Sequence, residues 1–292
     1  MPCPHLVLDG LLRPLHPHLF SMISTGSHAM LEHWVSYYRQ LGAPLEHARI
    51  VLDNHSAVSA SRAAATLTAL RVPFTWLEPG ERTSELRLTR LKLLNSYMAG
   101  LPKGAFVMPA DVDEHFSFPC NAVKTLMQRK HKGEVEALCG TMLDRTTVGG
   151  RPQSVLPSRS LQEQFPLCAP WRERRFAATG TAVKRAKVTK VTILRVRHAG
   201  GVPRFVDAHA ARVELVRGGG KTKLVKVGGP DKRNCVDTGY FSHYGFTSAK
   251  ASIFNGTGFN DLAAAGSGVL SEGALQELRR MSRPCTSYGL DL

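Results

Sequence analysis

The first 120 residues alternate between short apolar runs and amphipathic patterns, and this alternation restricts the fold more than any other feature. Apolar runs at 19–23, 49–52, 72–77 and 105–108 predict strands, and the patterns between them predict helices that end near residues 41, 70 and 98. Strands and helices that alternate at this spacing form parallel βαβ units with right-handed crossovers. The pattern therefore predicts an α/β fold with a mostly parallel central sheet and helices on both faces.

The second half of the chain predicts an irregular, β-rich part. Runs at 135–142, 187–196 and 211–227 favour strands, and glycines at 218–220 inside the last run indicate a hairpin. A final helix is predicted at 271–281. With no internal repeat and no clear linker, we divide the chain into an N-terminal extension (1–18), one domain (19–250) and a C-terminal tail with a helix (251–292).

The charge balance of the chain favours an anionic partner. The sequence has 38 Lys and Arg against 23 Asp and Glu, a net charge of +15. This balance suits a nucleic acid, a phosphorylated metabolite, an acidic glycan or a membrane surface. Because 43% of the residues are hydrophobic and 21% are charged, a disordered or fibrous chain is excluded. No run of 18 apolar residues occurs, so we expect a soluble protein without a membrane-spanning helix.

The six cysteines are scattered through the sequence, with no CxxC pair and no Cys/His cluster at zinc-finger spacing. Two interpretations remain open: thiols in a reducing compartment, or one or two disulfides.

Polar residues follow three of the predicted strands. These residues lie at 24–27, at Asp53 and Asn54, and at 111–114. Parallel strands bring their carboxyl ends to one edge of a sheet, where α/β proteins bind ligands. We therefore expect the three clusters to converge at one edge.

Three carboxylates close the last of these strands: Asp111, Asp113 and Glu114. Carboxylates so close repel one another, and a divalent cation between them keeps them ionised. Oxygen ligands of this kind select Mg²⁺ or Mn²⁺, which can in turn hold a diphosphate. The alternative is a solvated acidic turn.

The segment around these carboxylates resembles a known family. Residues 106–119, FVMPADVDEHFSFP, are similar to the strand and DxDE segment of glycosyltransferases of the GT-A fold, in particular the family 92 and family 2-like group. Further similar segments lie, in order, at 32–42, at 51–56, at Asp144-Arg145 with 160–166, and at His243-Tyr244. One difference is that Ser24-Thr25-Gly26 stands where the family usually has Lys-Asn-Glu.

The resemblance implies a GT-A fold and a metal-dependent glycosyltransferase. Such an enzyme moves a sugar from a nucleotide-diphosphate sugar to a hydroxyl of a glycan or glycoprotein acceptor, with inversion and with Mn²⁺ or Mg²⁺ bound. Carried over to this chain, the metal ligands are Asp111, Asp113 and a late histidine, either His243 or His209. The donor nucleotide is expected to contact Asp53, Asn54, Arg90 and Asp111, and the candidate bases for the acceptor hydroxyl are Glu163 and Asp207.

Two other functions remain open. A basic nucleic-acid-binding protein would explain the charge, yet no standard recognition motif is present, so we expect no specific nucleic acid partner. A GT-A module that binds glycans without catalysis is the second alternative. Basic residues at Arg172, Arg174, Arg175, Lys184, Arg185, Lys187 and Lys190 usually form a solvated face, although one cation among them could stabilise a leaving diphosphate.

The cellular compartment and the oligomeric state are the properties about which the sequence says least. If an N-terminal anchor precedes this sequence, the resemblance implies the Golgi lumen; otherwise it implies the cytoplasm. Peripheral association with a membrane stays open, and the sequence does not indicate an oligomeric state.

Overall fold

The computed structural model describes residues 10–23, 30–53, 57–128, 136–150, 153–169, 189–196, 203–207, 209–216, 222–228, 235–244, 276, 279–280, 282–288 and 290. Within these residues, no helix is both long and apolar enough to cross a membrane.

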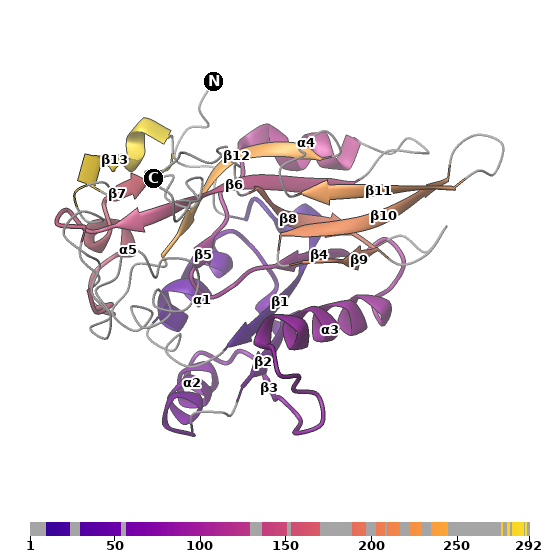
Figure 1. Cartoon of the computed structure of the whole chain (residues 1–292), viewed down its shortest axis with the longest axis horizontal. Helices are drawn as coiled ribbons and strands as arrows, with labels where there is room; N and C mark the ends of the chain where they lie inside the picture. Colours follow the sequence, from indigo (N-terminus) through magenta and orange to yellow (C-terminus); the bar gives the residue numbers. More distant parts are fainter. Residues whose placement is uncertain are drawn as a thin grey trace, which may run out of the picture.

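The N-terminal half follows the predicted alternation of strands and helices (Figure 1). Its elements are η2 (Arg13–Leu15), β1 (His18–Ile23), α1 (Leu31–Gln40), η4 (Leu45–His47), β2 (Arg49–Leu52), α2 (Ala57–Ala69), β3 (Thr75–Trp76), α3 (Leu86–Ala99), β4 (Phe106–Pro109), β5 (Glu114–His115) and α4 (Cys120–Gln128).

The C-terminal half is β-rich, as predicted. Its elements are β6 (Ala137–Thr146), α5 (Leu161–Gln164), β7 (Leu167–Ala169), β8 (Thr189–Arg195), β9 (Arg204–Phe205), β10 (Ala210–Val216), β11 (Thr222–Gly228), β12 (Val236–His243), β13 (Arg283–Pro284) and η7 (Cys285–Tyr288). Strands β10 and β11 pair antiparallel, which confirms the strands of the predicted hairpin.

The described strands form a ten-stranded central sheet and a separate three-stranded sheet. The central order is β13-β7-β6-β8-β4-β1-β2-β3, with β12 beside β6 and β5 beside β12. Strands β3, β2, β1 and β4 are mutually parallel, whereas β8 lies antiparallel between β4 and β6. The predicted α/β fold is therefore confirmed, with a sheet that is parallel in its N-terminal half and mixed beyond β4.

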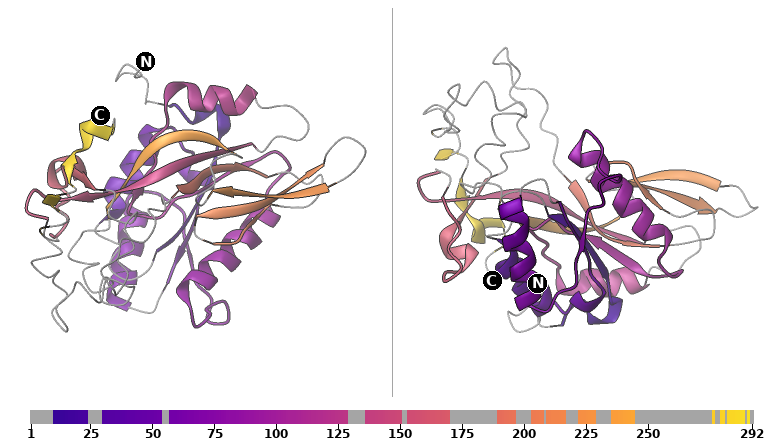
Figure 2. Two further views of the ribbon diagram at one scale, coloured as in Figure 1. Left: turned by 45° about the horizontal axis from the view of Figure 1, so that its top comes forward. Right: turned by 90° about the horizontal axis from the view of Figure 1, so that it is seen from below.

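Apolar residues cover both faces of the sheet, because alternate residues of a strand point to opposite sides. On β1, Leu19 and Ile23 join the cluster that contains α1, α2 and α4, while Phe20 and Met22 join the cluster that contains α3. The three-stranded sheet β9-β10-β11 packs into the same cluster as α3. Figure 2 shows α3 and α4 on opposite sides of the strands, so helices cover both faces as predicted.

Two disulfides link segments from the C-terminal part of the sequence to strands of the central sheet. Cys139 on β6 pairs with Cys235, which directly precedes β12, and Cys168 on β7 pairs with Cys285 in η7. The interpretation as reduced thiols is therefore wrong for these four cysteines. Residues before 18 and after 250 also reach the core, since Leu12 and Leu290 are buried and β13 pairs with β7.

Several sequence predictions fall outside the described residues. They are the polar cluster at 24–27, Asn54, the hairpin turn at 218–220, most of the helix at 271–281 and the basic residues from Arg172 to Lys187.

Candidate functional site

The acidic segment, residues 111–114, lies at the point of the sheet where the order of strand addition reverses. From β1 the chain adds β2 and β3 on one side, and it then returns to place β4 on the other side of β1. Ligands in α/β sheets bind outside the carboxyl ends of the strands at such a switch point. Asp111 follows the carboxyl end of β4 by two residues, so the predicted location of the acidic segment is confirmed.

A tight turn and a short strand fix the acidic segment. The amide of Glu114 donates to the carbonyl of Asp111, and the amide of Asp111 donates to the Glu114 carboxylate at 3.0 Å. Glu114 then starts β5, which pairs with the end of β12 and places His243 opposite Glu114. Asp113 and Glu114 are buried, whereas the Asp111 side chain keeps 31% of its surface exposed. Asp111 is therefore the most accessible of the three carboxylates.

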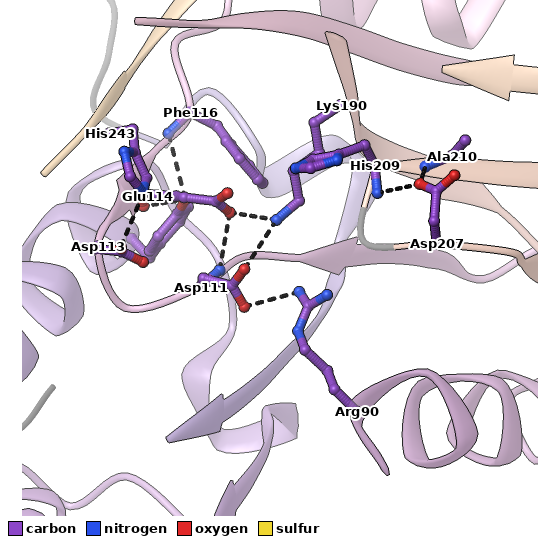
Figure 3. Close-up of polar contacts among 11 residues, drawn as sticks. Arg90, Asp111, Asp113, Glu114, Phe116, Lys190, Asp207, His209, Ala210 and His243 are labelled. Carbon is purple, nitrogen blue, oxygen red and sulfur yellow. Dashed lines mark hydrogen bonds and ion pairs between the residues drawn. The ribbon is translucent and has the colours of Figure 1, made fainter. Parts of the chain in front are cut away.

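Two cations from distant elements contact the accessible carboxylate (Figure 3). Arg90 on α3 places Nη2 2.8 Å from one oxygen of Asp111, and Lys190 on β8 places Nζ 3.2 Å from the other. The Lys190 ammonium also lies 2.5 Å from the Glu114 carboxylate. Lys190 is completely buried, so the expectation of a solvated face is wrong at this residue.

His243 lies between two carboxylates. Its Nε2 is 2.9 Å from Asp113 Oδ2, and its Nδ1 is 2.6 Å from Asp144 Oδ1 on β6. All three side chains are buried. The amide of Tyr244 donates to the carbonyl of Asp113 at 2.7 Å, which holds the end of β12 against the acidic segment. The predicted return of His243 to Asp113 is confirmed as a geometric fact, although this contact does not test metal binding.

Burial shifts the pKa values of Glu114 and of the adjacent His115. Removal from water raises the pKa of Glu114, and the repulsion of Asp111 and Asp113 acts in the same direction, while Lys190 opposes both. Burial lowers the pKa of His115 to about 3, helped by the positive potential of His33 and Arg145. His115 is therefore neutral at physiological pH and stacks on Tyr37 at 4.2 Å between ring centroids.

The remaining predicted site residues have local contacts. Asp53 follows β2 and accepts a 2.8 Å hydrogen bond from Arg82. Asp207 accepts from the amides of His209 and Ala210 at 2.7 and 2.8 Å. Figure 3 draws Asp207 and His209 on the Lys190 side of the acidic segment, away from His243.

Glu163 lies in a capping box at the start of α5. Its carboxylate accepts from the amide of Ser160 at 3.1 Å, and its own amide donates to the Ser160 hydroxyl. Within the described residues, no hydrogen bond or ion pair joins Glu163 to the acidic segment. Its proposed role as a base therefore stays a prediction, as do the roles of Asp53 and Asp207.

Two residues of this site had no specific role in the sequence analysis, which named Lys190 only as one member of a basic cluster. Lys190 is the single charged side chain inside the run 189–194, and a lone lysine in an apolar strand was the available signal. Asp144 belonged to a segment similar to the GT-A family but had no assigned role. Its link to His243 depends on the pairing of β6 with β12, which no local pattern reveals.

Two of the expected metal ligands, Asp113 and His243, lie together at this site. Among the described residues, no group of three His, Cys, Asp or Glu side chains could hold a metal ion. Asp113 and His243 nevertheless place an oxygen and a nitrogen 2.9 Å apart, and the Asp111 carboxylate lies two residues away. Because Mg²⁺ often binds through one or two carboxylates, several waters and substrate phosphates, these residues fit such an ion.

Comparison with known proteins gives distant similarities to solved structures. No family model matches this chain, and no curated protein matches it. A crystal structure described as that of 4-diphosphocytidyl-2C-methyl-D-erythritol synthase is 12% identical, with a TM-score of 0.29. The alignment covers 61% of this chain and 75% of that chain. This similarity is too distant to assign an activity.

Proposed function

We propose that this protein is a GT-A glycosyltransferase that moves a sugar from a nucleotide-diphosphate sugar to an acceptor hydroxyl. One observation carries the proposal: the segment that resembles the DxDE motif lies at the switch point of the sheet, and His243 meets it from a strand far along the chain. A solvated acidic turn would not require buried partners from α3, β8 and β12.

The accessible side of Asp111 is the proposed location of the donor diphosphate. Arg90 and Lys190 already bring a guanidinium and an ammonium group to this carboxylate. A guanidinium matches the geometry of phosphate oxygens, and a buried ammonium acts as a strong point charge where water is excluded. Both cations would stabilise negative charge that develops on the leaving diphosphate.

Asp111, Asp113 and His243 are the residues that would hold Mn²⁺ or Mg²⁺. A bound divalent ion would neutralise the diphosphate as it leaves. The alternative ligand His209 has less support, because Figure 3 draws it on the other side of Lys190.

The proposed reaction is a single displacement. The acceptor oxygen forms a bond to the anomeric carbon while the bond from that carbon to the diphosphate oxygen breaks. The diphosphate leaves with the electron pair, the acceptor proton passes to a carboxylate, and the anomeric configuration inverts. Of the two candidate bases we test Asp207 first, because the Glu163 carboxylate is engaged in the capping box of α5.

The two disulfides support an oxidising compartment, such as the lumen of the secretory pathway. A net charge of +15 also suits an anionic donor. Glycans or glycoproteins are the acceptors that fit this proposal.

A panel of nucleotide-diphosphate sugars, each with and without Mn²⁺, tests the proposal. We expect at least one donor to raise the melting temperature only with Mn²⁺ and to release its nucleoside diphosphate when a glycan acceptor is added, since a ligand of the native state stabilises it. Asp111→Asn and Asp113→Asn should lose both effects, whereas Glu46→Gln, an exposed change in η4, should keep them.

Other outcomes of this experiment would favour one of the two alternative functions. Donor binding without release would favour the non-catalytic glycan-binding module. Sequence-selective binding of RNA or DNA at physiological salt, together with no response to any donor, would favour the nucleic-acid-binding protein.

A further inference from the structure

Three positively charged residues form a row across the three-stranded sheet β9-β10-β11 (Figure 1). Arg212 on β10 is the register partner of Arg204 on β9 and of Lys226 on β11. All three residues are exposed. Register partners point to the same face of a sheet with their Cβ atoms about 5 Å apart, so the three cations lie on one line of about 10 Å. We call these three residues the basic row.

The sheet fixes the backbone beneath the basic row. Its opposite face is buried, because Ala211 and Val213 of β10 pack into the cluster that contains α3. The Asn95 side chain on α3 also accepts a hydrogen bond from the amide of Phe205 at 2.8 Å and donates one to the Phe205 carbonyl at 3.0 Å. Phe205 directly follows Arg204. The spacing of the row is therefore set by the fold before any partner binds.

The basic row does not help to stabilise the sheet. Like charges that lie directly opposite each other on neighbouring strands repel and lower the stability of a sheet. Among the described residues, neither Arg204 nor Arg212 makes an ion pair. An anionic partner that neutralises the row accounts for this arrangement, whereas the stability of the fold does not.

The basic row lies close in sequence and in strand pairing to the proposed donor site. The amide of Val191, which directly follows Lys190 on β8, donates to the carbonyl of His209 at 3.0 Å. Arg212 follows His209 by three residues along the same chain segment, a step of about 10 Å in an extended strand. A long ligand on the row therefore lies within reach of the part of β8 that carries Lys190.

The chemistry of this face separates three kinds of anionic partner. Proteins bind single-stranded nucleic acids by stacking bases on aromatic side chains, and the aromatic residue of these three strands, Phe205, is buried. Anionic lipids are recognised by clusters of about four to eight cations, more than the row contains. A linear glycan with repeated carboxylate or sulfate groups matches a line of exposed cations, and the planar fork of arginine suits such oxygen anions.

We propose that the basic row binds an acidic glycan and that acidic glycans are the acceptor class of the proposed transfer. The binding step depends on the row alone and needs neither a metal ion nor a donor. The acceptor role rests on the proposed function.

Calorimetric titration in EDTA, without a donor, tests the binding step. The probes are fragments of heparin, hyaluronan and neutral dextran of equal length. The wild type should bind at least one of the two acidic glycans and should not bind dextran. In the row variant, Arg204→Gln, Arg212→Gln and Lys226→Gln together, this affinity should fall by at least about tenfold at physiological salt, because three charge contacts are lost.

A second variant controls for the loss of net charge. It combines Arg62→Gln, Lys92→Gln and Lys124→Gln, which remove the same charge from exposed positions on α2, α3 and α4. Salt screens charges that lie far from the ligand, so this control should lose less than about twofold in affinity. Equal losses in the two variants would overturn the proposal, because net charge alone would then attract the glycan. Equal affinity of the wild type for dextran would overturn it as well.

The melting temperature separates binding from folding. The row variant should melt at or above the temperature of the wild type, because it removes repulsion between strands. A row variant that melts below the charge-matched control would show that the row serves the fold, and would overturn the proposal. Binding of single-stranded RNA or of phosphatidylserine vesicles that depends on the row more strongly than glycan binding does would overturn it in favour of that partner.

A transfer assay distinguishes this inference from the proposed function. With an acidic glycan as acceptor, the row variant should raise the KM for the acceptor and leave kcat and donor affinity unchanged. Wild-type donor binding in Mn²⁺, combined with glycan affinity that does not depend on the row, would overturn this inference alone. Glycan binding that depends on the row, combined with no response to any donor, would support the binding step and overturn the proposed function together with the acceptor role.

Discussion

The Lys190 ammonium lies 2.5 Å from the Glu114 carboxylate, and both side chains are buried. Lys190→Met should therefore destabilise the protein by about 3–5 kcal/mol, because it leaves a buried carboxylate without its counter-charge. Chemical denaturation measures the loss. Lys92→Met, on the exposed side of α3, removes the same charge and should change stability by less than about 0.5 kcal/mol.

Replacing both partners tests whether the pair acts as a unit. The double variant Lys190→Met with Glu114→Gln should lose less stability than the sum of the two single losses, because neither charge is then left buried alone. Additive losses would show that the two groups do not interact in solution.

His115 should make the protein sensitive to acid. Burial lowers its pKa to about 3 in the folded state, while the unfolded chain takes up the proton near pH 6.5. The unfolded state thus binds more protons between these values, so the contribution of His115 to stability is present above pH 6.5 and is lost as pH falls toward 3. The variant His115→Phe keeps an aromatic ring against Tyr37. In EDTA, the free energy of unfolding of the wild type should fall between pH 7 and about pH 4 by about 3 kcal/mol more than that of this variant. Parallel pH profiles for the two proteins would contradict this explanation.

Gly228 should not tolerate a side chain. Its φ is +78°, and an added Cβ would lie 2.4 Å from the carbonyl oxygen of His209. Gly228→Ala should cost about 1–3 kcal/mol in unfolding free energy. Gly149 is the control, since a Cβ there meets nothing within 4 Å. Equal melting temperatures for the two alanine variants would show that the end of β11 is placed wrongly.

The disulfide between Cys168 and Cys285 should stabilise the fold. It joins residues 117 apart in the sequence, so its loss frees a long loop in the unfolded chain. Cys168→Ser combined with Cys285→Ser should lower stability by about 2–5 kcal/mol. Mass spectrometry of unreduced peptides checks the pairing itself, and recovery of either cysteine as an alkylated thiol from the native protein would contradict it.

The N-terminal half of the fold could be predicted because its signals are local. The run at 49–52 matches β2, and the helix end predicted near residue 98 lies within one residue of the end of α3. Each of these elements shows its own apolar pattern over a few residues. The order of strands beyond β4 could not be predicted in this way, because the insertion of β8 between β4 and β6 depends on contacts across long stretches of sequence.

In the candidate site, too, residues with local signals could be predicted and residues with distant partners could not. Asp111, Asp113 and Glu114 were predictable as a group, because they are neighbours in sequence and end an apolar strand. Lys190 and Asp144 were not, since their partners lie 76 and 99 residues away. The buried position of Lys190 also opposes the usual exposure of lysine.

Calorimetric titration of nucleoside diphosphates into the wild-type protein and into Asp113→Asn, each in Mn²⁺ and in EDTA, tests the central claim most directly. We predict that the wild type binds at least one nucleoside diphosphate in Mn²⁺, and that EDTA or the substitution weakens binding by at least about tenfold, which is about 1.4 kcal/mol. Equal affinity in Mn²⁺ and in EDTA, or equal affinity of the wild type and the folded variant, would contradict the account.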